Sequence, residues 1–135
     1  MTPLVLDSGI LYAYYDRSDA WHDRARPLLD EEPGLLILPL PILPEVDFLL
    51  GRRLGRRARM ALQEDITRGV YTPLVMTGPH LQRALALDLR YEVLDLGFVG
   101  TAVIAVAEEL GGRIATSDRR HFGAVAGELG LTLLP

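Results

Sequence analysis

Three acidic residues stand at the borders between apolar and polar segments, and their oxygen atoms could together bind a metal ion. Asp7 and Asp118 each follow an apolar, strand-like segment directly, and Glu45 opens a helix-like segment shortly after the apolar residues 35–38. Parallel strands of an α/β fold present their carboxyl ends to one crevice, so acids far apart in the chain can meet there. An acidic crevice without cysteine offers hard oxygen ligands, which favour Mg²⁺ or Mn²⁺ over zinc.

Each of these acids also has an ordinary structural role open to it. Asp7 could cap a helix and Asp118 could cap the turn that follows it, because a carboxylate accepts free backbone N–H groups there. Glu45 in the first turn of a helix would favour the helix dipole. Each acid alone is weak evidence for a metal site. All three at the expected edge of one sheet favour a shared site for one or two metal ions, as phosphoryl-transfer chemistry requires.

Strand-like and helix-like segments alternate along the whole chain and would position these acids. This alternation predicts an α/β fold, with a parallel sheet covered by helices on both faces. At this length we expect residues 1–135 to form a single domain. We expect strands at residues 3–7, 35–38, 70–75, 91–94, 113–116 and 131–134, and helices at about residues 9–15, 20–31, 42–54, 56–67, 77–89 and 99–110.

The composition limits where the protein works and what it binds. The 135 residues include no cysteine and carry a net charge of -4. We expect a cytoplasmic protein, because the sequence has no disulfides, no bilayer-length apolar run and no signal-peptide pattern. All fourteen cationic residues are arginine, and five of them fall between residues 52 and 59. The guanidinium group of arginine suits phosphate oxygens, so arginines beside an acidic pocket would fit a polyanionic ligand. The alternative is that a GC-rich coding bias favours arginine and that this cluster is only the solvated face of a helix.

Four segments in the same order resemble PIN-domain proteins of the VapC toxin type, and the resemblance extends over nearly the whole chain. They are residues 4–9, 44–46 and 102–110 and, most specifically, Ile114-Ala115-Thr116-Ser117-Asp118-Arg119-Arg120-His121-Phe122. The resemblance implies a single PIN-like domain with a five-stranded parallel sheet between helices.

The same resemblance implies an activity, a cofactor and partners. It implies an endoribonuclease that cleaves RNA with Mg²⁺ or Mn²⁺, in which Asp7, Glu45 and Asp118 are the metal ligands and catalytic residues. It also implies a homodimer and a cognate VapB-like antitoxin that blocks the site.

The sequence departs from the family pattern at Gly100. In the family, the helix after the Leu-Gly-Phe-Val-like segment begins with a metal-binding aspartate, and glycine offers no ligand and disfavours a helix. Two interpretations stay open, namely that the site is degraded or that another group substitutes. Asp95, five residues upstream, is a candidate substitute, although a turn aspartate is its commoner role. Glu92 is expected to face solvent beside the strand at 91–94.

Several polar residues near the acids have two interpretations each. Ser8 could bind a water or a phosphate or could begin a helix, and Thr116 and Ser117 at a strand end have the same ambiguity. His121 could touch substrate, or it could be a packed or capping histidine.

Other functions remain to be weighed against the ribonuclease. A catalytically inactive PIN module that binds RNA or an antitoxin keeps the fold, and Gly100 is the feature that favours it. A phospho-receiver domain needs a lysine, which this chain lacks. Dehalogenase-type phosphatases need two aspartates separated by one residue, where this chain has Asp7-Ser8-Gly9. No glycine-rich phosphate loop follows a strand, which argues against a nucleotide-binding domain.

Overall fold

A computed structural model describes all residues of the chain, 1–135, and contains one five-stranded sheet. Every pair of neighbouring strands is parallel, in the order β3-β2-β1-β4-β5. The fold class is confirmed, with a five-stranded parallel sheet between two layers of helices. The strands are β1 (Leu4–Leu6), β2 (Leu36–Pro39), β3 (Thr72–Leu74), β4 (Arg113–Ala115) and β5 (Thr132–Leu134).

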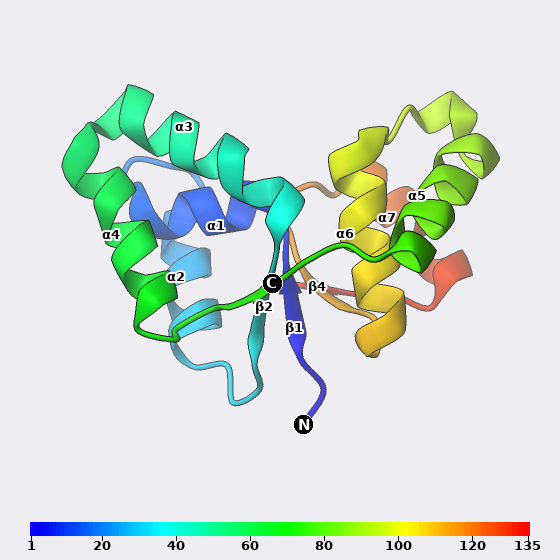
Figure 1. Cartoon of the computed structure of the whole chain (residues 1–135), viewed down its shortest axis with the longest axis horizontal. Coiled ribbons are helices and arrows are strands. Elements are labelled where there is room, and N and C mark those ends of the chain that lie inside the picture. The colour runs from blue at the N-terminus through cyan, green and yellow to red at the C-terminus, as the bar shows by residue number, and fades with distance from the viewer.

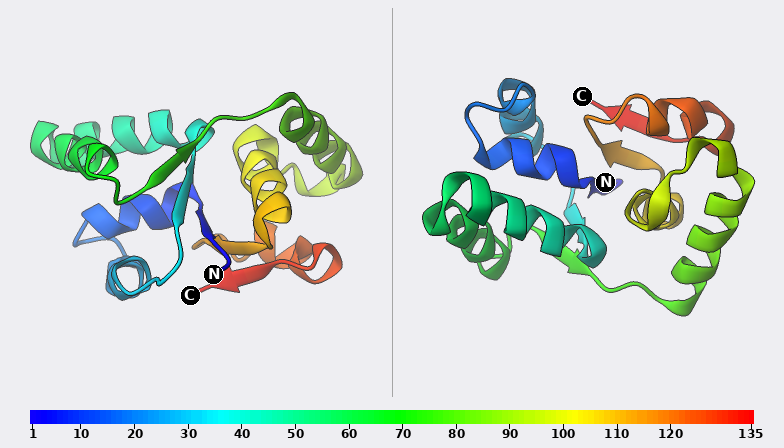
Figure 2. Two further views of the ribbon diagram at one scale, coloured as in Figure 1. Left: turned by 60° about the horizontal axis from the view of Figure 1, so that its bottom comes forward. Right: turned by 90° about the horizontal axis from the view of Figure 1, so that it is seen from above.

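The helices form one group on each side of the sheet (Figures 1 and 2). Helices α1 to α4 lie on one side and α5 to α7 on the other, and α6 packs against β1 and β4. None of the helices is both long and apolar enough to cross a lipid bilayer. Their bounds are α1 (Ser8–Tyr15), α2 (His22–Asp30), α3 (Leu43–Leu54), α4 (Arg56–Thr67), α5 (Gly78–Arg90), α6 (Gly97–Leu110) and α7 (His121–Leu129), with two short 3-10 turns, η1 (Leu40–Ile42) and η2 (Glu92–Leu94).

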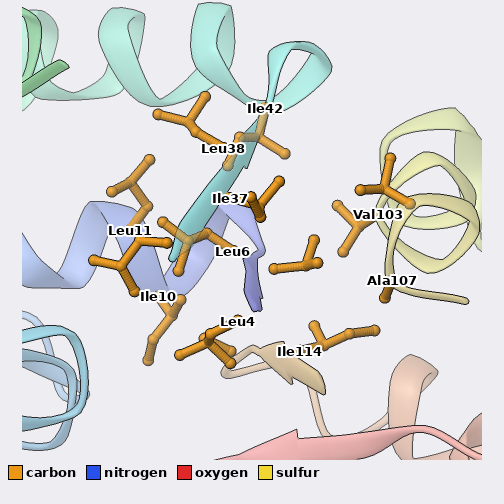
Figure 3. Packing of buried hydrophobic residues seen from close by; sticks show 14 of the residues in the cluster. Leu4, Leu6, Ile10, Leu11, Ile37, Leu38, Ile42, Val103, Ala107 and Ile114 are labelled. Atoms are coloured by element: carbon orange, nitrogen blue, oxygen red, sulfur yellow. The ribbon is translucent and has the colours of Figure 1, made fainter. Parts of the chain in front are cut away.

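Strand β1 lies at the centre of the sheet and of the hydrophobic core. All three of its residues are fully buried, as expected for a parallel strand that is covered on both faces. Val5 pairs with Ile37 of β2 on one side and with Ile114 of β4 on the other. Around these strands pack Ile10 of α1 and Val103 of α6 (Figure 3). This packing fixes the carboxyl ends of β1 and β4 side by side, so that the residues after them share one edge.

Two sequence-based expectations about elements are wrong. Residues 91–94 form no strand; they contain the turn η2 between α5 and α6, and the side chain of Val93 is 98% exposed. Residues after Asp118 form a full helix, α7, rather than the expected turn alone. Its buried residues Phe122 and Val125 face the core, and the two glycines of the helix, Gly123 and Gly127, hid this helical spacing because glycine disfavours helices.

Candidate active site

A pocket of about 260 Å³ lies where the carboxyl ends of β1 and β4 meet the first turns of α1, α3, α6 and α7. All three acids expected from the sequence line it, namely Asp7, Glu45 and Asp118. They come from three separate parts of the chain, and the parallel topology brings them to one edge of the sheet. Gly100 lines the same pocket from the first turn of α6.

Asp7 is the most buried of the three acids, with only 7% of its surface exposed. Its Oδ1 accepts a hydrogen bond from the Ser8 backbone N–H at 2.9 Å, and its Oδ2 accepts one from the Thr116 hydroxyl at 2.8 Å. Burial raises the pKa of Asp7 to about 6, although the hydrogen bonds from Thr116 and Ser8 oppose the rise. The negative charges of Asp118 and Glu45 raise this pKa further, so a cation in the pocket would favour the ionised form.

A fully buried hydroxyl joins the two aspartates. The Thr116 Oγ1 donates to Asp7 Oδ2 and accepts from the Asp118 backbone N–H at 2.9 Å. Thr116 therefore holds the end of β4 against the end of β1 and orients Asp7. The sequence placed Thr116 at a strand end but left its role open, and the structure assigns it this positioning contact.

Asp118 is held by the beginning of α7. Its Oδ1 accepts the backbone N–H of His121, and its Oδ2 lies 2.9 Å from Nδ1 of the same histidine. His121 is thus in contact with the capping carboxylate and also lines the pocket. Asp118 therefore has an ordinary structural role and also lines the pocket. The same is true of Asp7, which is the N-cap of α1, and of Glu45, which lies in the first turn of α3.

Two glycines shape the pocket in opposite ways. A Cβ at Gly9 would stand 2.7 Å from the Ser117 hydroxyl oxygen, so the close approach of α1 to the end of β4 leaves no room for a side chain there. This contact was missed in the sequence, where Gly9 is only the small residue after Asp7-Ser8. A Cβ at Gly100 would meet nothing nearer than the Leu96 Cβ at 4.0 Å. The pocket therefore has room for a side chain at position 100.

The two other acids considered near Gly100 do not enter the pocket. Asp95 is exposed in a left-handed conformation with φ 50° and does not line the pocket. Glu92 is exposed, as expected, although it lies on the turn η2 rather than beside a strand. Compensation for Gly100 by Asp95 therefore finds no support in the geometry.

The pocket offers oxygen atoms of the kind that Mg²⁺ and Mn²⁺ bind. Besides the three carboxylates, the hydroxyl residues Ser8 and Ser117 line it. No three Asp, Glu or His side chains converge closely enough to hold a metal ion by themselves. An ion held here would keep several water molecules between itself and the carboxylates, which is usual for Mg²⁺. The residues present thus fit a partly hydrated, hard divalent cation.

Known proteins are similar to this chain over most of its length. The family model described as PIN domain matches residues 4–128, which include all three acids. Among curated proteins, Ribonuclease VapC26 of Mycobacterium tuberculosis (strain ATCC 25618 / H37Rv) is 24% identical over 123 residues, covering 90% of this chain and 91% of the relative.

Solved structures share the fold. The VapC20 toxin of Mycobacterium tuberculosis, described as sarcin-ricin loop cleaving, superposes with a TM-score of 0.72 at 25% identity, covering 80% of this chain and 83% of that chain. A toxin–antitoxin complex from Klebsiella pneumoniae gives 0.71 at 18% identity, and FitAcB from Neisseria gonorrhoeae gives 0.73 at 14% identity. Each of these two matches covers 98% of this chain and 96% of the other chain.

Proposed function

The chain belongs to the PIN-domain family, and on that premise we propose that it is a metal-dependent endoribonuclease of the VapC toxin type. One observation carries the proposal: Asp7, Glu45 and Asp118, from three distant segments, line a single pocket at the carboxyl edge of the sheet. The name of Ribonuclease VapC26 and the description of VapC20 as a cleaving toxin support RNA as the substrate.

In this proposal the three carboxylates hold a hydrated Mg²⁺ or Mn²⁺, partly through its water molecules. A bound ion of this kind supplies water activation and charge stabilisation for phosphodiester hydrolysis. The protein supplies the orientation of the ligands. Thr116 fixes Asp7 and His121 fixes Asp118 through hydrogen bonds, whereas Glu45 is exposed on α3 and free to adjust to the substrate.

The proposed partners are a VapB-like antitoxin and a second copy of the chain. Structural neighbours solved as toxin–antitoxin complexes support the antitoxin. An unpartnered apolar stripe on α5 supports a homodimer: Leu81, Leu85 and Leu89 follow at intervals of four residues and are 47%, 63% and 68% exposed. Helix α5 lies at the outer edge of the molecule, where a second copy could reach it (Figures 1 and 2).

The decisive experiment measures metal binding and RNA cleavage in parallel. Calorimetry with Mg²⁺ and Mn²⁺ should show binding by the natural chain that is lost in Asp7→Ala. Gly100→Asp should bind at least about tenfold more tightly, because a fourth carboxylate enters a pocket with room for it. Gly127→Asp is the matched control, since it adds the same charge to an exposed glycine of α7 outside the pocket.

Cleavage of single-stranded RNA then decides between an enzyme and a binding module. The proposal requires Mg²⁺-dependent or Mn²⁺-dependent cleavage by the natural chain that disappears in Asp7→Ala. If neither the natural chain nor Gly100→Asp cleaves RNA, the protein is an inactive PIN module and the ribonuclease proposal is wrong.

A further inference from the structure

A second cavity of about 490 Å³ opens on the surface where α3 meets α4, outside the acidic pocket. We call it the α3–α4 groove. It is lined by Asp47, Phe48, Gly51, Arg52, Arg56 and Arg59.

The charge of the α3–α4 groove is positive, and its single acid is already engaged. The Asp47 Oδ1 accepts a hydrogen bond from Gln63 Nε2 at 3.0 Å and lies 3.7 Å from the Arg59 guanidinium. Arg52 and Arg56 are exposed and make no ion pair with any acid of the chain. These two guanidinium groups therefore stand free in a protein whose net charge is -4.

The packing of the two helices sets this charge in place. A Cβ at Gly51 would stand 3.1 Å from Cδ of Arg59, so the absence of a side chain lets Arg59 lie against α3. Arg56 and Arg59 are three residues apart on α4 and share one face. The arginines consequently line a defined concave surface rather than extend from it in all directions.

The α3–α4 groove continues the wall of the acidic pocket along one helix. Glu45 lines the pocket and Phe48 and Arg52 line the groove. Spacings of three and seven residues place these side chains in one stripe along α3. Phe48 is 60% exposed and lies between the acid and the arginine in this stripe. One stripe of α3 thus connects the groove with the carboxylates of the pocket.

We propose that the α3–α4 groove binds single-stranded RNA and leads it to the acidic pocket. Arg52 and Arg56 contact phosphates, and Phe48 stacks on a base. Proteins bind single-stranded nucleic acids by combining free arginine side chains with exposed aromatic rings. The guanidinium groups contact the phosphate backbone and the rings stack on the bases. This inference rests on the proposed ribonuclease function, because it takes RNA as the substrate class.

Binding is tested without cleavage, by fluorescence anisotropy of a labelled single-stranded RNA of mixed sequence in EDTA. The double variant Arg52→Gln/Arg56→Gln should weaken binding about tenfold at low salt. The slope of log affinity against log salt concentration should become less steep by about 1.4, because each lost phosphate contact lowers it by about 0.7. The matched control is Arg17→Gln/Arg57→Gln, which removes the same charge from two exposed arginines that do not line the groove. It should weaken binding by less than about twofold.

Substitution of Phe48 separates stacking from charge. Phe48→Ala should weaken RNA binding by about fivefold or more with an unchanged salt slope, because it removes a stacking surface and no charge. Val93→Ala, at an apolar residue that is 98% exposed elsewhere, should leave binding unchanged. All these positions are on the surface, so circular dichroism and thermal melting should show native folding.

The outcomes separate this inference from the proposed function. Equal losses in the two arginine double variants would show that general charge, rather than the groove, binds RNA, and would overturn the inference. Absence of RNA binding by the natural chain would overturn it too and would leave the groove to an acidic protein partner. RNA cleavage that depends on Asp7 but is unaffected by the groove substitutions would keep the ribonuclease and reject the groove.

Discussion

At the scale of single residues, the carboxylate of Asp7 meets two opposed electrostatic demands. Burial and the nearby charges of Asp118 and Glu45 raise its pKa, which favours the neutral form. Metal binding needs the ionised form. The folded protein without metal is therefore under electrostatic strain at neutral pH, and this strain lies at the most buried of the three acids.

Substitution of Asp7 by asparagine should stabilise the metal-free protein at neutral pH. A raised pKa means that the native state holds this proton more firmly than the unfolded state, so its contribution to stability falls as pH rises from about 4 to about 6. The free energy of unfolding of Asp7→Asn in EDTA should exceed that of the natural chain by about 1 to 2 kcal/mol at pH 7.5. Urea unfolding at pH 7.5 and at pH 4.5 measures it.

The gain from Asp7→Asn should be smaller at pH 4.5, where Asp7 is protonated in the native state but still mostly ionised in the unfolded state, and it should approach zero only below the unfolded-state pKa of 3.8. Asp88→Asn, on α5 outside the pocket, should change little at either pH. A loss of stability in Asp7→Asn at pH 7.5 would contradict the prediction. Added Mg²⁺ should stabilise the natural chain and not Asp7→Asn, because the ligand binds only the native carboxylate site.

The sequence indicated the acids of the site but not the contacts that hold them. Asp7, Glu45 and Asp118 were predicted because each follows or opens a regular element, which is a local pattern. The hydrogen bond from Thr116 to Asp7 joins residues 109 positions apart, and the contact of Gly9 with Ser117 depends on how closely α1 approaches β4. Such contacts are set by the packing of elements and leave no local pattern.

At the scale of elements, one ion pair holds the segment between α2 and β2 to the beginning of β4. Arg113 donates to both carboxylate oxygens of Glu32, at 2.6 and 3.2 Å, and to the Thr2 carbonyl at 3.0 Å. The Glu32 side chain is only 2% exposed. Hydrogen bonding by Arg113 lowers the pKa of Glu32, so this pair stabilises the fold in the charged form.

Glu32→Gln should lower the stability by about 2 to 3 kcal/mol at neutral pH, because it leaves Arg113 with a neutral partner in a buried site. A lowered pKa means that this contribution is complete above the unfolded-state pKa and is lost as pH falls through the folded-state pKa. The difference between the natural chain and Glu32→Gln should therefore begin to shrink as pH falls below the ordinary value of 4.5 and should vanish only below the lowered folded-state pKa of Glu32. Urea unfolding at several pH values measures it.

The neighbouring Glu31 provides the control for this ion pair, since it is exposed. Glu31→Gln should change stability little at any pH. A difference for Glu32→Gln that persists unchanged at low pH would show that packing, and not the charge of Glu32, stabilises this junction.

Most elements could be predicted from sequence, and the failures have physical causes. Helix α4 begins and ends as expected because Gly55 precedes it and its apolar residues repeat with helical spacing. The prediction of a strand at 91–94 was wrong because a short apolar segment does not by itself distinguish a strand from other local structures. There, the chain turns between two helices that pack on each other, with Asp95 and Gly97 at positive φ.

At the scale of the whole molecule, the α5 stripe of Leu81, Leu85 and Leu89 is a continuous apolar surface that monomeric folding leaves uncovered. Ala84 and Leu87 on the other face of α5 are buried, and α5 packs against α6. The exposed leucines therefore have no partner within the chain. Apolar surface that repeats along one helix face is typical of an interface with another protein.

Leu85→Arg should convert the proposed homodimer into a monomer, because it places an unpaired charge at the centre of the stripe. Sedimentation velocity at several concentrations measures the mass, and Leu35→Arg, at a leucine that is 59% exposed and lies outside α5, should leave it unchanged. A natural chain that is monomeric at every concentration would contradict the prediction.

The central position of β1 also has a consequence for synthesis on the ribosome. One edge of β1 pairs with β2. Its other edge pairs with β4, which begins only at Arg113 and is therefore translated much later. Until then the emerging polypeptide has an open sheet edge and lacks Asp118, so it has no complete acidic site. A prematurely terminated product would be inert and prone to aggregate. Under the proposed function, toxicity therefore requires that translation has passed β4 and Asp118.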